Sequence, residues 1–321
     1  MNDTYDFLII GSGAAGLSAA LYAGRYNLKT LVMIGPEFGG ATMTAGEIWN
    51  YPGDLTGDTY TLMQNMRKQA EQNGAVLEEG FVEFLTRDGD LFIAHVAKSK
   101  GGAEYKTINA KTVLLATGAE RRKLGLPNEK ELSGRGIHYC VTCDGPVYNG
   151  KEVAIVGGGD ASVKGVILMA QYAKKIYLLV RGDKMRAEPS NQERIKALGP
   201  KLEILMNTEV KELVGTKKLE KIVLSKEVNG SAELIVDGLF VEIGADPAVK
   251  LAKDVGAELD KLGYVAVDPT MHTNVSGFYS AGDTVNIFGP FKQTITSAAM
   301  GTVAATSAYD YIQKRTYAVG A

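Results

Sequence analysis

Cysteine, tryptophan and histidine are scarce in this chain of 321 residues, which has two cysteines, one tryptophan and three histidines. Two cysteines cannot build a disulfide framework, and a zinc site, which needs about four ligands, would have to recruit most of the histidines as well. Charge of one sign is also missing, because 35 basic residues against 37 acidic ones leave a formal net charge of −2. A balanced surface has no broad field that attracts nucleic acid, so we expect neither a nucleic-acid partner nor a bound metal.

Long apolar runs and a basic leader are absent too. No run reaches the roughly 20 apolar residues that cross a bilayer, and the acidic start of the chain is unlike a secretory signal. We therefore expect no membrane association and a cytoplasmic location. What is present, 45% hydrophobic and 22% charged residues, is typical of a globular protein. The length favours two domains.

A strand, a glycine turn and a helix follow one another near the N-terminus. The apolar strand at 6–10 leads into the turn Gly11-Ser12-Gly13-Ala14-Ala15-Gly16, a small-residue helix at 17–24 and a second strand at 28–34. Such glycines let backbone approach a pyrophosphate at a helix N-terminus, which predicts dinucleotide binding, with a purely structural turn as the alternative. The usual acidic ribose ligand after the second strand is missing, unless Glu37 takes that place.

The same order of elements recurs in the middle of the chain. A strand at 152–156 is followed by Gly157-Gly158-Gly159-Asp160, a helix at 163–172 and a strand at 175–180. No acid follows that strand, whereas Arg181 and Arg186 do, a pattern that suits the 2′-phosphate of NADPH better than the free hydroxyl of NADH. A solvated charged loop is the alternative interpretation.

The remaining strand patterns indicate how the two dinucleotide folds are connected. Short strands are predicted at 81–85, 91–96 and 105–110, a buried strand ending at a glycine at 112–118, and further strands at 264–267 and 277–280, with a final helix at 293–313. The segment after residue 247 is too short for a core of its own, so we expect it to return to the first domain. The predicted fold class is α/β, with two Rossmann-like, three-layer ββα dinucleotide-binding domains. The second, 119–246, is inserted into the first, 1–118 and 247–321.

Both cysteines fall within one short segment, Cys140-Val141-Thr142-Cys143. A loop this small adds little stability when it is closed by a disulfide, which argues for chemistry over a structural staple. The spacing allows a disulfide within one turn and is typical of thiols that ionise near neutral pH. Asp144 follows as a candidate proton donor and acceptor. A pair of inert buried thiols, with Asp144 as a helix or turn cap, is the alternative.

With Cys140–Gly145 placed just before the second glycine turn, and with Ala116-Thr117-Gly118 and Ala281-Gly282-Asp283, the sequence resembles the low-molecular-weight thioredoxin reductases over nearly its whole length. The resemblance implies a homodimeric FAD enzyme, a thioredoxin-disulfide reductase, that takes electrons from NADPH and reduces a thioredoxin-like disulfide protein. It also implies that Cys143 faces the flavin, that Cys140 attacks the partner's disulfide and that Asp144 is the acid–base residue.

The resemblance assigns further residues to the two cofactors. For FAD these are Gly11, Ser12, Gly13, Ala14, Ala15, Gly16, Gly40, Asn50, Val82, Ala116, Thr117, Gly118, Gly282, Asp283, Lys292, Gln293 and Thr294. For NADPH they are Gly157, Gly158, Gly159, Asp160, Arg181 and Arg186. Because the cysteines and the nicotinamide site share one domain, we expect them to alternate at the flavin through a hinge near Gly118–Arg121 and Gly244–Asp246.

The second site departs from the family pattern. The family has a His-Arg-Arg run before a further arginine, whereas here the run is Val180-Arg181-Gly182, and the family's glutamate after the glycine turn is replaced at Lys164-Gly165. These losses motivate a rival hypothesis in which ferredoxin or a reduced flavin is the electron donor. A second rival is a non-enzymatic flavin redox sensor in which the cysteine pair switches conformation.

Overall fold

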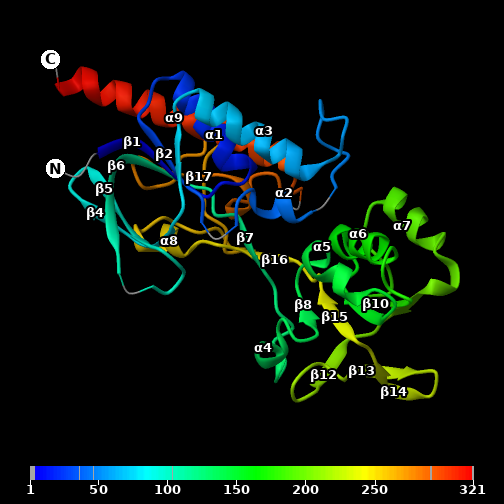
Figure 1. Ribbon diagram of the computed structural model, residues 1–321. Helices are drawn as coiled ribbons and strands as arrows, with labels where there is room; N and C mark the ends of the chain where they lie inside the picture. The colour runs from blue at the N-terminus through cyan, green and yellow to red at the C-terminus, as the bar shows by residue number, and fades with distance from the viewer. Residues whose placement is uncertain (1–3, 36, 46, 103, 290, 320–321) are drawn as a thin grey trace. The chain divides into compact units, whose positions relative to one another are not determined.

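The computed structural model describes residues 4–35, 37–45, 47–102, 104–289 and 291–319. The chain divides into two compact units. The first unit comprises Met1–Ala119 and Pro247–Ala321, and the second comprises Glu120–Asp246. Each unit contains a mainly parallel sheet with helices packed on it (Figure 1), so the predicted α/β class with two Rossmann-like folds is confirmed.

The parallel sheet of the first unit is built around β1, Thr4–Ile10. Its strands lie in the order β3-β2-β1-β6, and β17 pairs with the other edge of β6. The neighbours are β2 (Thr30–Met33), β3 (Val76–Glu78), β6 (Lys106–Leu115) and β17 (Phe278–Ser280). Because layers cover both faces, the consecutive residues Phe7, Leu8, Ile9 and Ile10 of β1 are all buried, and this half of the strand is an unbroken apolar run.

The strand β6 belongs to two layers. Its first half pairs antiparallel with β5 (Leu91–Ala97), which pairs with β4 (Phe81–Asp88), and from Asn109 onward β6 pairs parallel with β1. The sequence predicted two separate strands here, which was wrong. The polar Lys111 does not end the strand, because its ammonium lies at the surface and pairs with Asp6 at 2.7 Å.

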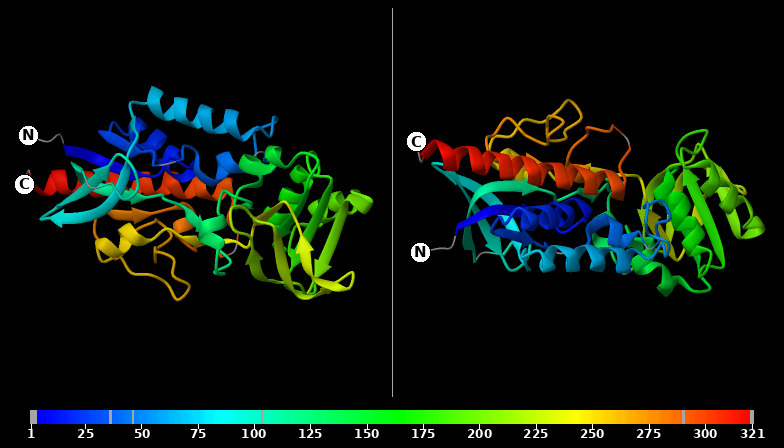
Figure 2. Two further views of the ribbon diagram at one scale, coloured as in Figure 1. Left: turned by 60° about the horizontal axis from the view of Figure 1, so that its bottom comes forward. Right: turned by 90° about the horizontal axis from the view of Figure 1, so that it is seen from above.

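Three helices cover the sheet of the first unit. The helix α1 (Ala14–Arg25) lies between α3 (Thr59–Gln72) and α9 (Thr294–Val319), as the views in Figures 1 and 2 agree. Glycines allow this close packing, since a Cβ on Gly301 of α9 would lie 2.0 Å from the carbonyl oxygen of Ala15. Although α9 has 26 residues, no helix in the described ranges is both long and apolar enough to cross a membrane.

Shorter elements complete the first unit. They are α2 (Gly40–Thr44), α8 (Lys250–Asp254) and the 3₁₀ turn η3 (Gly282–Thr284). The strand predicted at 264–267 does not form, because Val265 makes only isolated bridges, to Leu259 and to Val285. The C-terminal segment does return to the first unit, through the pairing of β17 with β6.

The second unit repeats the plan with a five-stranded parallel sheet in the order β11-β10-β9-β15-β8. Alternate residues of β9 face opposite layers. Val153 and Ile155 pack toward the helices, while Ala154 and Val156 pack toward the antiparallel sheet β12-β13-β14. The strands are β8 (Ile137–His138), β9 (Glu152–Val156), β10 (Lys175–Val180), β11 (Leu202–Met206), β12 (Val210–Val214), β13 (Lys221–Val228), β14 (Ser231–Ile235) and β15 (Gly238–Val241). The helical elements are α4 (Glu129–Leu132), α5 (Val141–Asp144), η1 (Gly145–Tyr148), α6 (Asp160–Met169), α7 (Pro189–Lys196) and η2 (Gly199–Lys201).

Two short strands connect the units. They are β7 (Ala119–Arg121) and β16 (Ala245–Pro247), which pair as a two-stranded sheet. Beyond the strands, the amide of Arg122 donates to the carbonyl of Gly244 and the amide of Ala248 to the carbonyl of Gly118, each at 3.0 Å. The chain therefore leaves the first unit and re-enters it through hydrogen-bonded neighbours.

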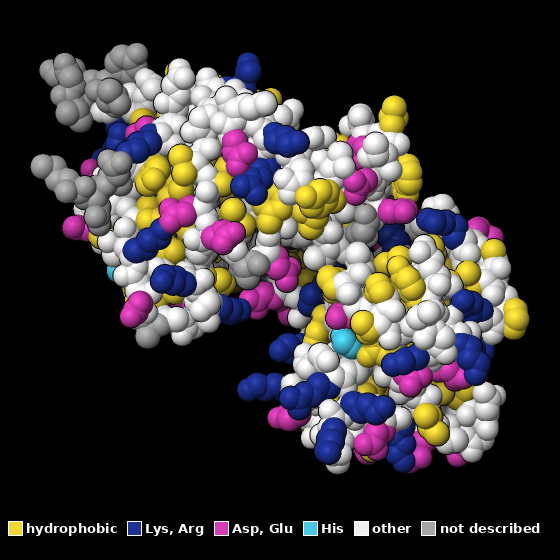
Figure 3. All heavy atoms as spheres, viewed as in Figure 1, with side chains coloured by type: hydrophobic (Ala, Val, Ile, Leu, Met, Phe, Trp, Pro, Cys, Tyr) yellow, Lys and Arg dark blue, Asp and Glu magenta, His cyan; other side chains and the backbone are white. Residues whose placement is uncertain are grey.

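Charges of both signs are interspersed on the face in view in Figure 3. This distribution agrees with the near-neutral composition of the chain. No single-sign field of the kind that concentrates a polyanion is visible on that face.

Replacing Gly301 by alanine tests the packing of α9 on α1. Alanine favours a helix by about 1 kcal/mol over glycine, but the added methyl would meet the Ala15 carbonyl at 2.0 Å. We expect overpacking to prevail, lowering the free energy of unfolding by about 1–3 kcal/mol. Urea unfolding followed by circular dichroism measures the change, with Thr302→Ala on the same helix as control. A Gly301→Ala protein that is more stable than the wild type would contradict this account.

Candidate redox and nucleotide sites

The first glycine turn is shaped by close backbone contacts. Gly11 has φ 114°, and a Cβ there would lie 2.2 Å from the carbonyl oxygen of Ala116, just after β6. A Cβ on Gly16 would lie 1.9 Å from the carbonyl oxygen of Gly11. Ser12 is buried, and its hydroxyl donates to the carbonyl of Ile34 at 3.1 Å, which ties the turn to the chain after β2. Packing within the protein thus explains two of the three glycines.

Gly13 has no such explanation. A Cβ there would meet nothing closer than the carbonyl oxygen of Gly39, at 4.0 Å. Gly40 lies opposite, and its Cβ would be 3.6 Å from the Cα of Gly13. Gly13 is also the N-cap of α1, without a side chain that accepts from the first turn of the helix. This open space beside exposed helix N–H groups fits a phosphate that contacts the backbone directly.

Several other residues assigned to FAD gather near this turn. Gly282 packs against the start of α1, since its Cβ would be 3.2 Å from that of Ala15. Thr294, at the start of α9, shares a hydrogen bond of 3.1 Å with Thr42 of α2. The amide of Asn50 donates to the side-chain oxygen of Gln293 at 2.9 Å. Residues distant in sequence are therefore brought together by α1, α2 and α9.

Asp283 and Lys292 influence each other. Burial raises the pKa of Asp283 above its ordinary value, and the nearby ammonium of Lys292 offsets only part of that rise. Burial lowers the pKa of Lys292, and the charge of Asp283 offsets only part of that fall. The ammonium of Lys292 lies 4.2 Å from the ring centroid of Tyr264 and donates to the carbonyl of Val285. Within the part of the chain that the structure describes, the Asp283 carboxylate accepts no hydrogen bond, so its oxygens are available to a ligand hydroxyl.

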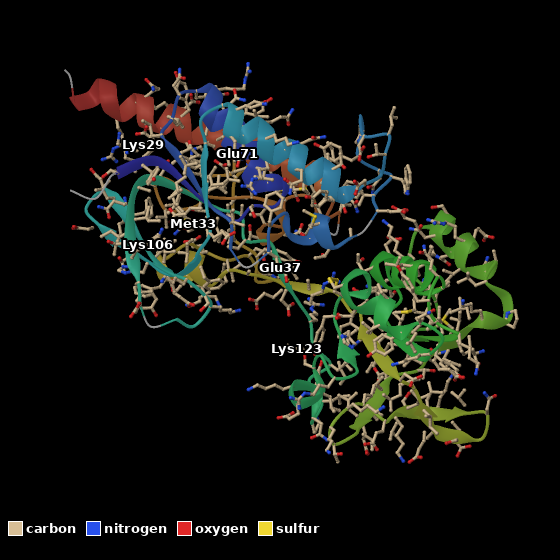
Figure 4. All side chains as sticks on the ribbon, viewed as in Figure 1. Lys29, Met33, Glu37, Glu71, Lys106 and Lys123 are labelled. Atoms are coloured by element: carbon tan, nitrogen blue, oxygen red, sulfur yellow. A yellow bond between two sulfur atoms is a disulfide. The ribbon has the colours of Figure 1, made fainter. Side chains whose placement is uncertain are left out.

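The remaining expected FAD residues differ in how closely they approach the turn. Ala116 contacts Gly11 as described, and Thr117 donates to the carbonyl of Ala248 at 2.9 Å, beside Gly118. Val82 is buried on β4, where it pairs with Val96, and its contacts belong to the core. Glu37, the substitute ribose ligand suggested by the sequence, is exposed beyond the end of β2 (Figure 4).

Cys140 and Cys143 form a disulfide, with their Cα atoms 5.4 Å apart. Cys140 is the N-cap of α5, and its sulfur accepts a hydrogen bond from the amide of Cys143 at 3.1 Å. An amide donor aimed at sulfur favours the thiolate once the disulfide is reduced. Cys140 is partly exposed and Cys143 exposed in the second unit, so both can take part in exchange.

Asp144, the predicted acid–base residue, ends α5 and is partly exposed. One of its carboxylate oxygens, Oδ2, lies 3.2 Å from Nδ1 of His138. The other ring nitrogen of His138 lies 2.7 Å from the hydroxyl of Tyr148. Sequence reasoning missed His138 and Tyr148, although His138 stands only two residues before Cys140.

The buried carboxylate of Glu242 contacts the first residue of α5, the helix that carries Cys143. Sequence reasoning did not predict this residue either. Glu242 follows β15 and is 7% exposed. It forms an ion pair with Arg121 and accepts a hydrogen bond from the amide of Val141. Burial raises the pKa of Glu242, and Arg121 opposes that rise. Glu242 therefore links β7 to the first residue of α5.

The second glycine turn repeats the first with changes. A Cβ on Gly157 would lie 2.3 Å from the carbonyl oxygen of Glu242, while Gly159 faces open space. A buried serine, Ser162, stands where the first turn has its third glycine, and its hydroxyl donates to the carbonyl of Gly159 at 2.8 Å. The amide of Arg186 donates to the carbonyl of Gly158 at 2.6 Å, so the loop after β10 folds onto the turn.

The carboxylate of Asp160 is engaged within the chain. It lies at the N-terminus of α6 and accepts from the amide of Glu188 at 2.9 Å and from the side chain of Asn191 at 3.0 Å. Arg181 and Arg186 are exposed, and within the described residues their guanidinium groups form no ion pair. The structure thus brings the backbone of Arg186 to the glycine turn, where the carboxylate of Asp160 also lies, while the charge of Arg181 acts on Glu209.

Comparison with known proteins identifies the family. A match to the pyridine nucleotide-disulphide oxidoreductase family spans residues 5–305. The thioredoxin reductase of Streptomyces coelicolor is 40% identical over 316 residues, which cover 97% of this chain and 95% of that protein. The crystal structure of Lactococcus lactis thioredoxin reductase matches with a TM-score of 0.88 and 31% identity, covering 97% of this chain and 99% of the other.

One similar solved structure is of a protein named for ferredoxin and flavin. The ferredoxin-flavin thioredoxin reductase of Clostridium acetobutylicum matches with 30% identity and a TM-score of 0.51, covering 97% of this chain and 99% of the other. The family match, together with similarity over nearly the full length of both sequences and structures, leads to one assignment. The chain belongs to the pyridine nucleotide-disulphide oxidoreductases, and within them to the thioredoxin reductases.

Proposed function

We propose that this protein is an FAD-dependent thioredoxin-disulfide reductase that reduces a thioredoxin-like protein through Cys140 and Cys143. The observation that carries the proposal is the Cys140–Cys143 disulfide within a single turn, with an amide hydrogen bond to Cys140 and a carboxylate at Asp144. Further support is the similarity of the chain to the thioredoxin reductase of Streptomyces coelicolor, which covers 97% of this chain.

The residues of the first unit fit FAD. The open backbone at Gly13 and Gly40 suits a pyrophosphate, and the uncapped start of α1 supplies N–H donors. Asp283 offers free carboxylate oxygens to a ribityl hydroxyl, and the pair Asn50–Gln293 offers amide groups to the flavin ring. When bound, FAD supplies the two-electron redox chemistry that reduces a disulfide.

Disulfide exchange with the partner proceeds in two steps, each of which forms one S–S bond and breaks another. In the reduced protein, the thiolate of Cys140 attacks one sulfur of the partner disulfide, which forms a mixed disulfide and releases the other partner sulfur as a thiolate. The Cys143 thiolate then attacks the sulfur of Cys140, which re-forms the Cys140–Cys143 disulfide and releases the second partner sulfur. Asp144 takes a proton from a cysteine thiol and returns it to a released thiolate.

NADPH is the proposed electron donor, held at the glycines 157–159 with its 2′-phosphate toward Arg181 and Arg186. Support comes from the exposure of Arg181 and Arg186 and from the backbone amide of Arg186, which donates to the carbonyl of Gly158 in the glycine turn. Ferredoxin is the second candidate donor, because the family's histidine and one arginine are missing and a relative in the same family is titled a ferredoxin-flavin enzyme. The carboxylate of Asp160 beside the turn also weakens the attraction for a pyrophosphate.

The exchange of the cysteines and the nicotinamide at the flavin is proposed to use the paired strands β7 and β16 as a hinge. Gly118 and Gly244, both with positive φ, flank these strands and give them conformational freedom. A homodimer and a cytoplasmic location also remain predictions.

Loss of either cysteine or of the Asp144 carboxylate tests the exchange reaction. Cys143→Ser and Cys140→Ser should reduce multiple-turnover reduction of a thioredoxin disulfide to background while FAD stays bound. Asp144→Asn should slow turnover by about 10²- to 10⁴-fold, the usual contribution of an acid–base group. Insulin precipitation coupled to thioredoxin, with flavin content from absorbance, measures both effects.

Glu212→Gln, at an exposed position on β12 of the same unit, is the control for loss of a carboxylate and should keep the wild-type rate. Full turnover by Cys143→Ser would exclude the proposed cysteine chemistry. A wild-type protein whose disulfide cycles once but never turns over would instead favour the redox sensor.

Anaerobic titration with NADPH and with NADH tests the electron donor. If NADPH is the donor, it should bleach the flavin at micromolar concentrations. Arg181→Ala and Arg186→Ala should each raise its Kd about 10- to 150-fold, because each removes a charge-assisted hydrogen bond of about 1.5–3 kcal/mol. The affinity for NADH, which lacks the 2′-phosphate, should change little.

Arg194→Ala on α7 is the control for loss of an exposed arginine in the same unit. Flavin that stays oxidised with both nicotinamides, but is bleached by reduced ferredoxin, would overturn NADPH as donor and leave the disulfide chemistry intact.

A further inference from the structure

His138 is placed with little freedom in the second unit. It lies on β8, where the strand register sets it beside Phe240 of β15. Its ring stacks on Phe240 with the centroids 5.2 Å apart, and the residue is only 7% exposed. A buried imidazole is costly unless its nitrogens are hydrogen-bonded, so the two partners of this ring define what it can do.

Both ring nitrogens of His138 are engaged. Nδ1 lies 3.2 Å from Oδ2 of Asp144, and Nε2 lies 2.7 Å from the hydroxyl oxygen of Tyr148. An ionised carboxylate can only accept, so Nδ1 carries the proton of the neutral ring and donates to Asp144. Nε2 then has a lone pair, which accepts from the hydroxyl of Tyr148.

Tyr148 is suited to remain the donor at the far end. Burial raises its pKa to about 12, and the charges of Asp144 and Asp237 add to the rise. Its ring is fixed as well, because a Cβ on Gly238 of β15 would lie 2.4 Å from a ring carbon of Tyr148. The hydroxyl therefore keeps its proton and its direction at neutral pH.

The surrounding charged groups are few within the described residues. Asp237 acts on Tyr148, and Lys151 lies 5.4 Å from the centroid of the Tyr148 ring. Glu242, paired with Arg121, contacts the amide of Val141 at the other end of α5. Apart from these, the ring of His138 contacts the neutral Phe240, so its direct ionisable partners are Asp144 and Tyr148.

We propose that His138 is a positioning residue for disulfide exchange, which orients the Asp144 carboxylate so that it is ready to take the proton of the attacking cysteine. The proposal rests on the proposed thioredoxin reductase function. In the step concerned, the proton passes from the cysteine sulfur to a carboxylate oxygen of Asp144, leaving a thiolate and a neutral carboxyl group. His138 keeps its own proton on Nδ1, and no electron is transferred.

The pH dependence of cysteine reactivity tests this role. In His138→Phe the Asp144 carboxylate loses its imidazole hydrogen-bond donor, so we expect the rise of the exchange rate to move to higher pH by about one unit. On the acid side this corresponds to a rate about tenfold lower. The measurement is single-turnover oxidation of the dithiothreitol-reduced protein by thioredoxin disulfide, followed across the acid and neutral range.

A second readout does not depend on thioredoxin. Alkylation of the reduced protein by iodoacetamide, followed by mass spectrometry, should show the same shift in His138→Phe. If the wild type fails to reduce thioredoxin but the alkylation shift is present, the proposed function fails and the role of His138 stands. If the wild type turns over and neither profile shifts, the role of His138 is overturned.

Three further variants separate positioning from folding. His138→Asn keeps a side-chain donor toward Asp144 and should recover most of the wild-type profile. Tyr148→Phe removes only the hydroxyl that fixes the ring and should give a smaller shift in the same direction. If His138→Phe does not fold, a wild-type profile in Tyr148→Phe together with a displaced one in His138→Asn overturns the proposal.

The first unit offers a matched control. His272 also pairs with a carboxylate, with Nδ1 3.6 Å from Oδ2 of Asp268, and its ring lies 5.0 Å from that of Tyr279. His272→Phe should leave both pH profiles unchanged. An equal shift in this variant would mean that the effect of His138→Phe is not specific to Asp144.

Discussion

The close approach of backbone to backbone at two glycines is the constraint on which both units depend. Gly11 lies against the carbonyl of Ala116, and Gly157 against the carbonyl of Glu242, at distances that admit no side chain. In each case the first strand of the fold turns beneath the end of its neighbour in the parallel sheet. The N-terminus of the following helix is thereby directed at the carboxyl edge of the sheet, where dinucleotides bind in such folds. A side chain at either position would push strand and helix apart.

The two units use this shared geometry differently. In the first, the start of α1 has no capping side chain and the backbone at Gly13 faces open space. In the second, a serine replaces the third glycine and the Asp160 carboxylate binds the loop after β10. Both helices start at a glycine without a capping side chain, and Gly13 and Gly159 both face open space, but the second turn also has the Asp160 carboxylate beside it.

Sequence reasoning succeeded where the signal is local. The strands at 152–156 and 175–180 have the predicted bounds, because glycine turns and unbroken apolar runs are contiguous in the chain. It missed α3, whose buried stripe is limited to Thr59, Met63, Met66 and Ala70 in an otherwise polar segment. The partners of Asp144 were also missed, since His138 and Tyr148 meet only through the pairing of β8 with β15 and the space above Gly238. The spacing of these residues along the chain does not predict such a contact.

The pairing of β7 with β16 has a consequence for how such a protein can change over time. The chain leaves the first unit at Ala119 and returns at Pro247, through neighbouring hydrogen-bonded strands. Insertion between adjacent backbone positions leaves the host sheet and its helices continuous, so the host needs only a short bridge where the guest is removed. The disulfide-bearing unit can therefore be replaced as a whole without interrupting the first unit. Recombination at these two strands would exchange the disulfide-bearing unit and leave the sheet and helices of the first unit intact.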